Sequence, residues 1–185
     1  MPLPNRYMHV APGPDWPDVI NVIVEIPKGR RSKFEVDKAT GAMFVDRFLN
    51  VSMVYPCNYG YIPHTLAEDD DPVDILLPTP VPVAVGSVMR ARPVGFLEME
   101  DEGGRDVKVL AMPAEDVYPP YASIQNYSDV SPDMLDRIQH FFERYKDLNP
   151  GKWAKLQGWH SAEDARREIM DAVERYEKAP VKPNF

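Results

Sequence analysis

The fold is indicated most clearly by the stretch Gly86-Ser87-Val88-Met89-Arg90-Ala91-Arg92-Pro93-Val94-Gly95-Phe96-Leu97. Its pattern predicts a strand over residues 87–93, a bend, and a second strand over residues 95–99. A polar turn over residues 98–106 contains Gly103-Gly104, and residues 107–112 predict the following strand. Short strands at close spacing are typical of a small closed or partly closed β-barrel.

Segments before this stretch extend the pattern of short strands. Residues 19–26 are rich in β-branched side chains and are followed by Pro27, so they predict a strand that ends there. Residues 33–37 alternate between polar and apolar, which places Lys33 and Glu35, together with Asp37, on one face of a second strand. Further strand candidates are residues 42–48 and 73–77.

The last third of the chain changes to a helical pattern. Ser131-Pro132 is a typical helix start, and Asn149-Pro150-Gly151 is expected to end that helix. Ser161 is expected to cap a second helix, which Pro180 closes. The apolar stripes of the two helices are Leu135, Ile138, Phe141, Phe142 and Tyr145 in the first, and Ala165, Ile169, Ala172, Val173 and Tyr176 in the second. The sequence therefore predicts an α+β protein in which helices pack on the outside of a barrel.

Composition favours one domain over the whole chain, residues 1–185. The chain has 20 prolines, which argues against a helical bundle. Residues 1–18 are proline-rich and are expected to form an extended arm over the surface. The single cysteine, Cys57, fits a reducing compartment, and the first residues lack a signal-peptide pattern, so we expect a cytoplasmic protein.

Charge and motif content exclude several functional classes. The formal net charge of −8 argues against a nucleic-acid partner, and no apolar run is long enough to predict a membrane partner. Neither a Gly-x-Ser-x-Gly motif nor a Walker loop occurs. The four histidines show no zinc-ligand spacing.

The run Asp69-Asp70-Asp71-Pro72-Val73-Asp74 is the strongest functional signal. Carboxylate oxygens at this density suit hard cations such as Mg²⁺ or Ca²⁺, although a solvated acidic turn would show the same pattern. A second acidic loop contains Asp101, Glu102 and Asp106. If both loops lie at one end of a barrel, their carboxylates repel one another unless cations are present, so convergence implies a metal site.

Basic and phenolic side chains complete this hypothesis. Lys33, Arg47, Lys108 and Lys146 each lie near a carboxylate or an aromatic residue, a pattern that surface ion pairs also show. The aromatic segment over residues 55–61, interpreted as a turn, adds phenolic hydroxyls that can donate to phosphate oxygens. Together with the acidic loops, these groups suit a polyanion held jointly by cations and basic side chains.

The order of these motifs resembles the soluble family I inorganic pyrophosphatases of the bacterial type, over residues 21–176. The resemblance is carried by these segments: Val24-Glu25-Ile26-Pro27, Lys33-Phe34-Glu35-Val36-Asp37-Lys38, residues 41–47 and 55–61, Asp69-Asp70-Asp71-Pro72-Val73-Asp74, Arg92-Pro93-Val94-Gly95, Asp101-Glu102 with Asp106 and Lys108, and residues 140–148. It implies an OB-like five-stranded closed β-barrel with flanking α-helices. It also implies Mg²⁺-dependent hydrolysis of pyrophosphate by a metal-activated water, without a covalent intermediate.

The resemblance assigns roles position by position. The metal ligands are expected to be Asp69, Asp74, Asp101 and Asp106, with Glu25 and Glu35 in the outer metal shell. Asp71 matches the general base. The catalytic and substrate-binding residues are expected to be Lys33, Arg47, Tyr59, Lys108, Tyr145 and Lys146, with Tyr55 and Glu102 lining the site. Several Mg²⁺ ions are implied, with Mn²⁺ or Zn²⁺ as substitutes and Ca²⁺ as an inhibitor, in a homohexamer.

Two positions depart from the family pattern. Asp70 stands where related sequences commonly have glycine, and the loop over residues 28–32 is one residue shorter than in some relatives. The alternatives to this assignment are another metal-dependent phosphoanhydride hydrolase, a non-catalytic OB-like binding module and a metal-stabilised structural protein.

Overall fold

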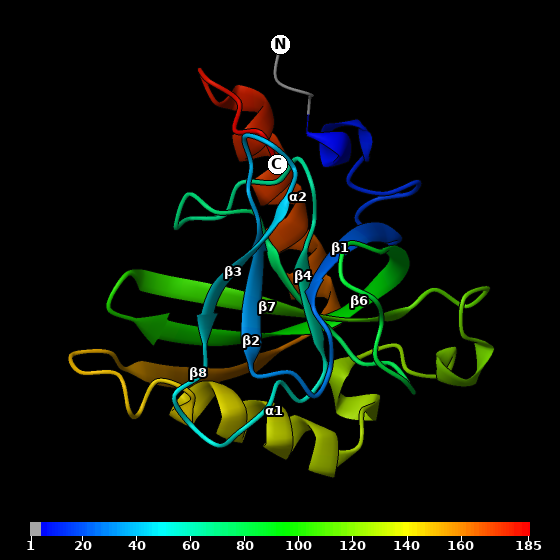
Figure 1. Ribbon diagram of the computed structural model, residues 1–185. Helices are drawn as coiled ribbons and strands as arrows, with labels where there is room; N and C mark the ends of the chain where they lie inside the picture. The colour runs from blue at the N-terminus through cyan, green and yellow to red at the C-terminus, as the bar shows by residue number, and fades with distance from the viewer. Residues whose placement is uncertain (1–4) are drawn as a thin grey trace.

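The computed structural model describes residues 5–185. Five strands form a closed ring, because β1 (Ile20–Ile26) pairs with both β4 (Asn58–Tyr61) and β6 (Val88–Asp101). The ring is completed by β5 (Asp74–Leu77), which pairs with β4, and by β7 (Gly104–Pro113), which pairs with β5 and β6. The predicted α+β architecture with an OB-like barrel is confirmed (Figure 1).

Two further pieces of sheet lie outside the ring. β2 (Ser32–Val36) and β3 (Met43–Phe48) form a separate hairpin, which lies in front of the barrel in Figure 1. β8 (Ala154–His160) pairs with the second half of β6 and extends the sheet beyond the ring. β8 was not predicted, because its alternation of polar residues with Leu156 and Trp159 lacks β-branched side chains.

Three predicted elements need correction. Residues 87–93 and 95–99 are not two strands but parts of the single strand β6, and the expected bend is a shift of register between Pro93 and Gly95. The segment 55–61 is not wholly a turn, since its last four residues form β4. The first helix, α1 (Pro132–Arg144), ends at the cap residue Tyr145 rather than at residues 149–151, which lie in turns.

The two helices cover different parts of the barrel. α1 buries Ile138, Phe141 and Phe142 against a core cluster that includes Leu97 and Leu110. α2 (Ala162–Lys178) packs Ala165, Ile169 and Ala172 of its predicted apolar stripe into a second cluster, and the other two stripe residues, Val173 and Tyr176, are also buried. The N-terminus of α2 is fixed by a capping box, in which Ser161 and Asp164 each accept a hydrogen bond from the other's backbone N–H. No helix among residues 5–185 is long and apolar enough to cross a membrane.

The N-terminal segment is only partly extended. Residues 6–9 form one turn of 3₁₀ helix, η1 (Arg6–His9), and Tyr7 is buried there. Two other 3₁₀ turns, η2 (Pro119–Tyr121) and η3 (Tyr127–Asp129), precede α1. Residues 1–4 of the predicted arm lie outside the described residues.

Candidate active site

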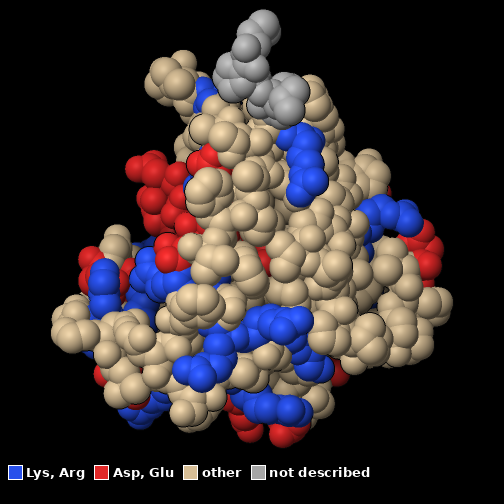
Figure 2. Space-filling view, viewed as in Figure 1, with Lys and Arg blue, Asp and Glu red and all other residues tan. Residues whose placement is uncertain are grey.

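One end of the barrel opens into a cleft of about 390 Å³. Basic and acidic side chains lie next to one another over the left side of the view in Figure 2. All fifteen residues assigned from the sequence line this cleft: Glu25, Lys33, Glu35, Arg47, Tyr55, Tyr59, Asp69, Asp71, Asp74, Asp101, Glu102, Asp106, Lys108, Tyr145 and Lys146. The closed ring explains their convergence, since it brings strands from distant parts of the sequence to a common end.

At the floor of the cleft, the ammonium group of Lys108 lies between two carboxylates. Its Nζ is 2.6 Å from Asp74 Oδ2 and 2.7 Å from Asp106 Oδ1. The parallel pairing of β5 with β7 places Asp74 directly beside Lys108. Burial raises the pKa of Asp74, and the nearby Asp106 carboxylate raises it further, while Lys108 opposes both effects. Positive charge at this position therefore favours the ionised form of Asp74.

Glu25 on β1 lines the cleft, and its carboxyl group is largely shielded from solvent. Its Oε1 accepts a hydrogen bond of 2.8 Å from the backbone N–H of Val36. Loss of solvent raises the pKa of Glu25 to about 8, and the neighbouring carboxylates of Asp74 and Glu35 contribute to the rise. The hydroxyl of Tyr61, which lines the same cleft, is buried without a hydrogen-bond partner.

The hairpin β2–β3 contributes basic groups from the opposite wall. Lys33 Nζ is 2.5 Å from Glu35 Oε1 and 3.3 Å from Asp46 Oδ2, and Asp46 also accepts a hydrogen bond of 2.6 Å from Arg47 Nε. Lys33 faces Arg47 across the hairpin, so the strand register sets the spacing of these two cations. Although burial lowers the pKa of Lys33, its bonds to the two carboxylates raise it above the usual value, and Lys33 remains charged.

The third wall combines the turn between β6 and β7 with the residues that follow α1. Lys146 Nζ lies 2.7 Å from Asp101 Oδ2 and 3.3 Å from Glu102 Oε1. Lys152 approaches Glu102 Oε1 to 2.8 Å. Desolvation raises the pKa of Glu102, but the hydrogen bonds from Lys152 and from backbone N–H groups, together with the charge of Lys146, outweigh it and lower this pKa to about 2, so the carboxylate is ionised at neutral pH.

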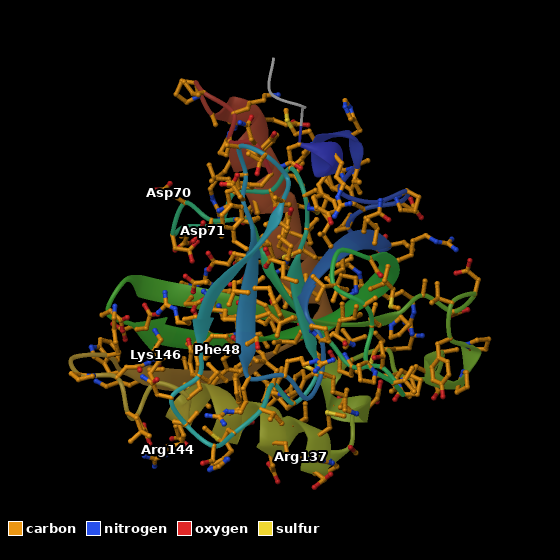
Figure 3. All side chains as sticks on the ribbon, in the orientation of Figure 1. Phe48, Asp70, Asp71, Arg137, Arg144 and Lys146 are labelled. Atoms are coloured by element: carbon orange, nitrogen blue, oxygen red, sulfur yellow. The ribbon has the colours of Figure 1, made fainter. Side chains whose placement is uncertain are left out.

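The acidic run lies in the loop over residues 62–73, between β4 and β5. Asp71 lines the cleft, and its Oδ1 is 2.7 Å from Lys38 Nζ. Asp69 accepts a hydrogen bond from the Asp71 backbone N–H, and desolvation raises the Asp69 pKa. Figure 3 shows Asp71 above and Lys146 below the tip of the β6–β7 hairpin.

Asp70 does not line the cleft, unlike its neighbours on both sides. Its backbone has φ = 67°, the left-handed conformation that glycine adopts without strain. This conformation suits the glycine that the family resemblance implies at this position.

Sequence reasoning missed nine residues that line the cleft, and four of them are polar: Lys38, Tyr61, Asn149 and Lys152. Lys38 and Tyr61 were visible as members of the quoted motifs, and Lys38 directly follows Asp37, but no role was assigned to either residue. Lys152 lies in the turn after α1 and reaches Glu102 only in three dimensions. With these residues, eight carboxyl groups and six basic groups line the cleft.

The donor set fits divalent cations that prefer oxygen ligands. Within residues 5–185, no three acidic, imidazole or thiol groups already stand together as a metal cluster. Instead, lysines pair with these carboxylates. Lys108 contacts Asp74 and Asp106, Lys146 contacts Asp101, and Lys38 contacts Asp71. Cations entering the cleft would take over this neutralising role. Burial, with a contribution from neighbouring carboxylates, raises the pKa of Glu25, Asp69 and Asp74, and bound cations would favour the ionised forms of these groups.

Fold and site together define the class: a barrel enzyme whose cleft places carboxylates and basic groups side by side. The sequence model of the family described as inorganic pyrophosphatase matches residues 22–177. The chain belongs to this inorganic pyrophosphatase family.

Individual relatives agree with this assignment. The chain is 53% identical to the inorganic pyrophosphatase of Xanthomonas campestris over 168 residues, which cover 90% of this chain and 94% of the relative. It is 50% identical to that of Aquifex pyrophilus over 172 residues, covering 93% and 97% of the two chains. The solved inorganic pyrophosphatase of Coxiella burnetii has a TM-score of 0.87 at 51% identity, covering 90% of this chain and 99% of that chain.

Proposed function

We propose that this protein hydrolyses inorganic pyrophosphate to two phosphates with Mg²⁺ as its cofactor. The observation that carries the proposal is the single cleft in which eight carboxyl groups and six basic groups face one another. A binding module for anions alone would not need this excess of carboxylates. A cation–polyanion complex is complementary to such a mixed lining.

The carboxylates divide into two groups by position. Asp69, Asp74, Asp101 and Asp106 would hold the cations, with Glu25 and Glu35 in the outer shell. When bound, Mg²⁺ supplies positive charge and increases the acidity of water. Because Mg²⁺ retains several waters, outer-shell carboxylates can act as hydrogen-bond acceptors. Mn²⁺ and Zn²⁺ are expected to replace Mg²⁺, and Ca²⁺ is expected to inhibit.

Asp71 would accept the proton from the attacking water, because its carboxylate lines the cleft beside Asp69. Among the described residues, no serine, threonine, cysteine or histidine lines the cleft. Desolvation raises the pKa of Tyr55, Tyr59 and Tyr145, so these phenols remain protonated donors. These features support direct attack by water without a covalent enzyme intermediate.

The substrate phosphates would lie between two walls of the cleft. Lys33 and Arg47 come from the hairpin, and Lys146 comes from the opposite side with the phenol of Tyr145. Lys108 and Tyr59 would contribute from the floor, where the Lys108 ammonium lies 5.5 Å from the Tyr59 ring centroid. These donors would stabilise the negative charge that develops on the leaving phosphate.

The direct test is phosphate release from pyrophosphate, with and without Mg²⁺. Asp71→Asn should lower kcat by about 10²–10³, because it removes the proton acceptor while preserving the shape of the side chain. The matched control is Asp70→Asn at the adjacent position, where asparagine tolerates the left-handed backbone. Metal-independent turnover, or equal kcat for Asp71→Asn and the control, would refute the mechanism. Comparison with ATP separates pyrophosphate hydrolysis from a broader phosphoanhydride hydrolase.

The family resemblance also supports a homohexamer formed by this single-domain chain. Size-exclusion chromatography with light scattering tests this assembly. A mass of about 127 kDa, six times the 21.1 kDa of one chain, is expected. A monomeric mass at micromolar concentration would contradict it.

A further inference from the structure

The loop over residues 62–73 carries both Asp69 and Asp71, yet it has little regular structure of its own. Inside the loop, three backbone or side-chain bonds tie residues 67–71 to one another. Thr65 joins Ile62 and Val73 at the base of the loop, and Lys38 contacts Asp71 from within the cleft. Outside the cleft, charged side chains of β7 and α2 contact residues 66 and 68. This contact region lies on the reverse side of the two aspartates.

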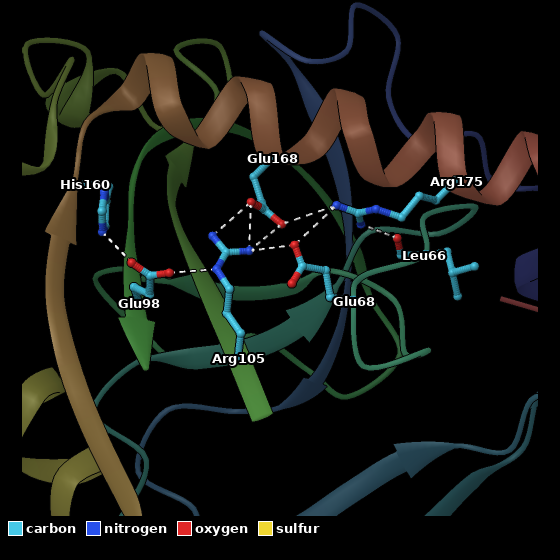
Figure 4. Close-up of polar contacts among 7 residues, drawn as sticks. All are labelled: Leu66, Glu68, Glu98, Arg105, His160, Glu168 and Arg175. Carbon is cyan, nitrogen blue, oxygen red and sulfur yellow. Dashed lines mark hydrogen bonds and ion pairs between the residues drawn. The ribbon is translucent and has the colours of Figure 1, made fainter. Parts of the chain in front are cut away.

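Arg105 on β7 is the centre of this support (Figure 4). Its Nε donates to Glu98 Oε1 at 2.6 Å, its Nη1 donates to Glu68 Oε1 at 3.3 Å, and its Nη2 donates to Glu168 Oε2 at 3.2 Å. Arg105 precedes Asp106 on the same strand, and neighbouring strand residues point to opposite faces. One strand therefore supplies a carboxylate to the cleft and an arginine to the support behind the loop.

Glu168 and Arg175 on α2 complete the contacts. The Glu168 side chain is 12% exposed and accepts from Arg105, while Arg175 Nη2 lies 3.8 Å from Glu168 Oε1. Arg175 Nη1 donates to the Leu66 carbonyl at 2.7 Å, and the Leu66 backbone N–H donates to the Ala172 carbonyl at 2.9 Å. The start of the loop is thereby fixed to the helix through both of its backbone polar groups.

The arrangement is also balanced electrostatically. Three carboxylates, those of Glu68, Glu98 and Glu168, surround Arg105 and would repel one another without it. His160 Nε2 lies 2.8 Å from Glu98 Oε2 and anchors the outer end of the network. A planar guanidinium can bridge several carboxylates in fixed directions, which an ammonium group cannot do.

A short distance separates this network from the cleft. A small void of about 10 Å³ is lined both by Glu68, Arg105 and Glu168 of the network and by the cleft residues Asp69 and Asp74. A shift of the loop toward or away from α2 would therefore move Asp69 relative to Asp74, which is fixed by its strand pairing.

We propose that Arg105 and Glu168 are positioning residues, which hold the loop over residues 62–73 so that Asp69 and Asp71 face the cleft. The inference rests on the proposed function, because it assigns the loop to cation binding and proton acceptance. Of the phosphate-binding groups, Lys33 and Arg47 lie on the β2–β3 hairpin and Lys146 follows α1, while Lys108 lies on β7 but is fixed there by the pairing with β5. Loss of the support should therefore affect cation binding and kcat, but not the KM for pyrophosphate.

The experiment compares Arg105→Gln and Glu168→Gln with a matched control, Arg167→Gln. Arg167 also lies on α2, but its side chain is 67% exposed and pairs only with Glu163 and Asp164 of its own helix. For each variant, the measurements are kcat, KM, the Mg²⁺ concentration for half-maximal rate, and Mg²⁺ affinity by calorimetry without substrate. All are made well below the melting temperature of each variant.

We expect kcat to fall about tenfold and the half-saturating Mg²⁺ concentration to rise about threefold in both test variants, since small misplacements of catalytic groups lower rates strongly. KM should stay within about twofold of the wild-type value. Arg105→Lys should recover part of the loss by keeping one cation near Glu168. Arg167→Gln should match the wild type in every measurement.

The proposal is overturned if the test variants match Arg167→Gln in kcat and Mg²⁺ affinity. It is also overturned if they only lower the melting temperature, or if KM rises as steeply as kcat falls. If the wild type releases no phosphate from pyrophosphate, the proposed function fails separately. In that case the calorimetric Mg²⁺ affinities still decide whether Arg105 and Glu168 position the loop.

Discussion

Asp70 has the conformation of a glycine and the side chain of an acid. It lies between Asp69 and Asp71, both of which line the cleft, but its own side chain does not. Its positive φ is tolerated because a short polar side chain can adopt the left-handed region more readily than most residues. Asp70 therefore contributes backbone geometry to the loop. Of the four aspartates in the run, only the other three line the cleft.

The first prediction concerns this backbone conformation. Asp70→Ala is expected to lower the free energy of unfolding by about 1 kcal/mol relative to Asp70→Gly, because the left-handed strain on alanine exceeds the extra chain entropy of glycine. Urea unfolding of the two variants measures the difference. Both variants should keep pyrophosphatase activity within about twofold of the wild type, since the side chain takes no part in the reaction. Equal unfolding midpoints would contradict the assignment of strain.

At the residue scale, sequence reasoning located the cleft because the chemistry is carried by residue types in compact motifs. The acidic run and the segment over residues 33–38 could be found without knowing any contact. The contacts themselves were not predictable. Lys38 meets Asp71, and Arg105 meets Glu168, only after strands and helices distant in the sequence have packed together.

Among the secondary-structure elements, β4 shows how closely the site depends on strand packing. Tyr59 and Tyr61 lie on either side of Gly60, which faces Val24 on β1. A Cβ atom at Gly60 would lie 2.0 Å from the Ile23 carbonyl oxygen, which is backbone and cannot rotate away. The absence of a side chain thus permits β1 to approach β4 closely enough to close this part of the ring.

The second prediction follows from that contact. Gly60→Ala should lower the free energy of unfolding by about 3 kcal/mol, since the backbones of β1 and β4 must separate to accept the methyl group. The matched control is Gly103→Ala, where the added Cβ would lie 3.2 Å from the nearest atom, the terminal oxygen of the Asp101 side chain. Thermal unfolding of both variants gives the comparison. A Gly60→Ala variant as stable as the control would show that the strands can separate without loss.

Element prediction succeeded where periodicity was strong and failed where tertiary pairing decides. The stripe Ala165, Ile169, Ala172 is fully buried in α2 as expected. β8 was not predicted, because its strand conformation depends on pairing with β6 more than on its own composition. β6 was divided at Pro93, although that proline lies at a register shift and the strand continues beyond it.

At the scale of the whole molecule, ionised carboxylates of the cleft lower the stability of the fold. Burial and neighbouring carboxylates raise the pKa of Glu25 to about 8 and also raise the pKa of Asp74 and Asp69. A carboxyl group whose pKa is higher in the folded state than in the unfolded state binds its proton more tightly in the fold. It therefore stabilises the fold while it is protonated. Its contribution is lost as pH rises from the unfolded value near 4.5 through the folded value.

The third prediction concerns pH and metal removal. In EDTA, the protein should be about 2 kcal/mol less stable at pH 8.5 than at pH 5.5, because groups such as Glu25 must ionise in the fold. The lowered pKa values of Glu98 and Glu102 affect stability only at lower pH and do not oppose this trend. Chemical unfolding at the two pH values gives the difference.

Two further measurements make this prediction specific. Glu25→Gln should reduce the pH dependence, because glutamine cannot ionise but can still accept the hydrogen bond from the Val36 N–H. Added Mg²⁺ should stabilise the protein more at pH 8.5 than at pH 5.5, since protons compete with the metal for carboxylates. Stability that is independent of pH in EDTA, or a larger Mg²⁺ effect in acid, would contradict this account.

The closed ring has a consequence for how the chain reaches its native state. Ile20 on β1 pairs with Ala91 on β6. One edge of β1 therefore stays unpaired until β6, a strand far along the chain, has formed. Pairings of such high contact order slow folding and leave the early strand edge open to association with other chains. A nascent chain on the ribosome cannot complete the barrel until β6 has emerged. The cleft, which draws residues from β1 to the turns after α1, should therefore be among the last regions to gain protection from hydrogen exchange during refolding.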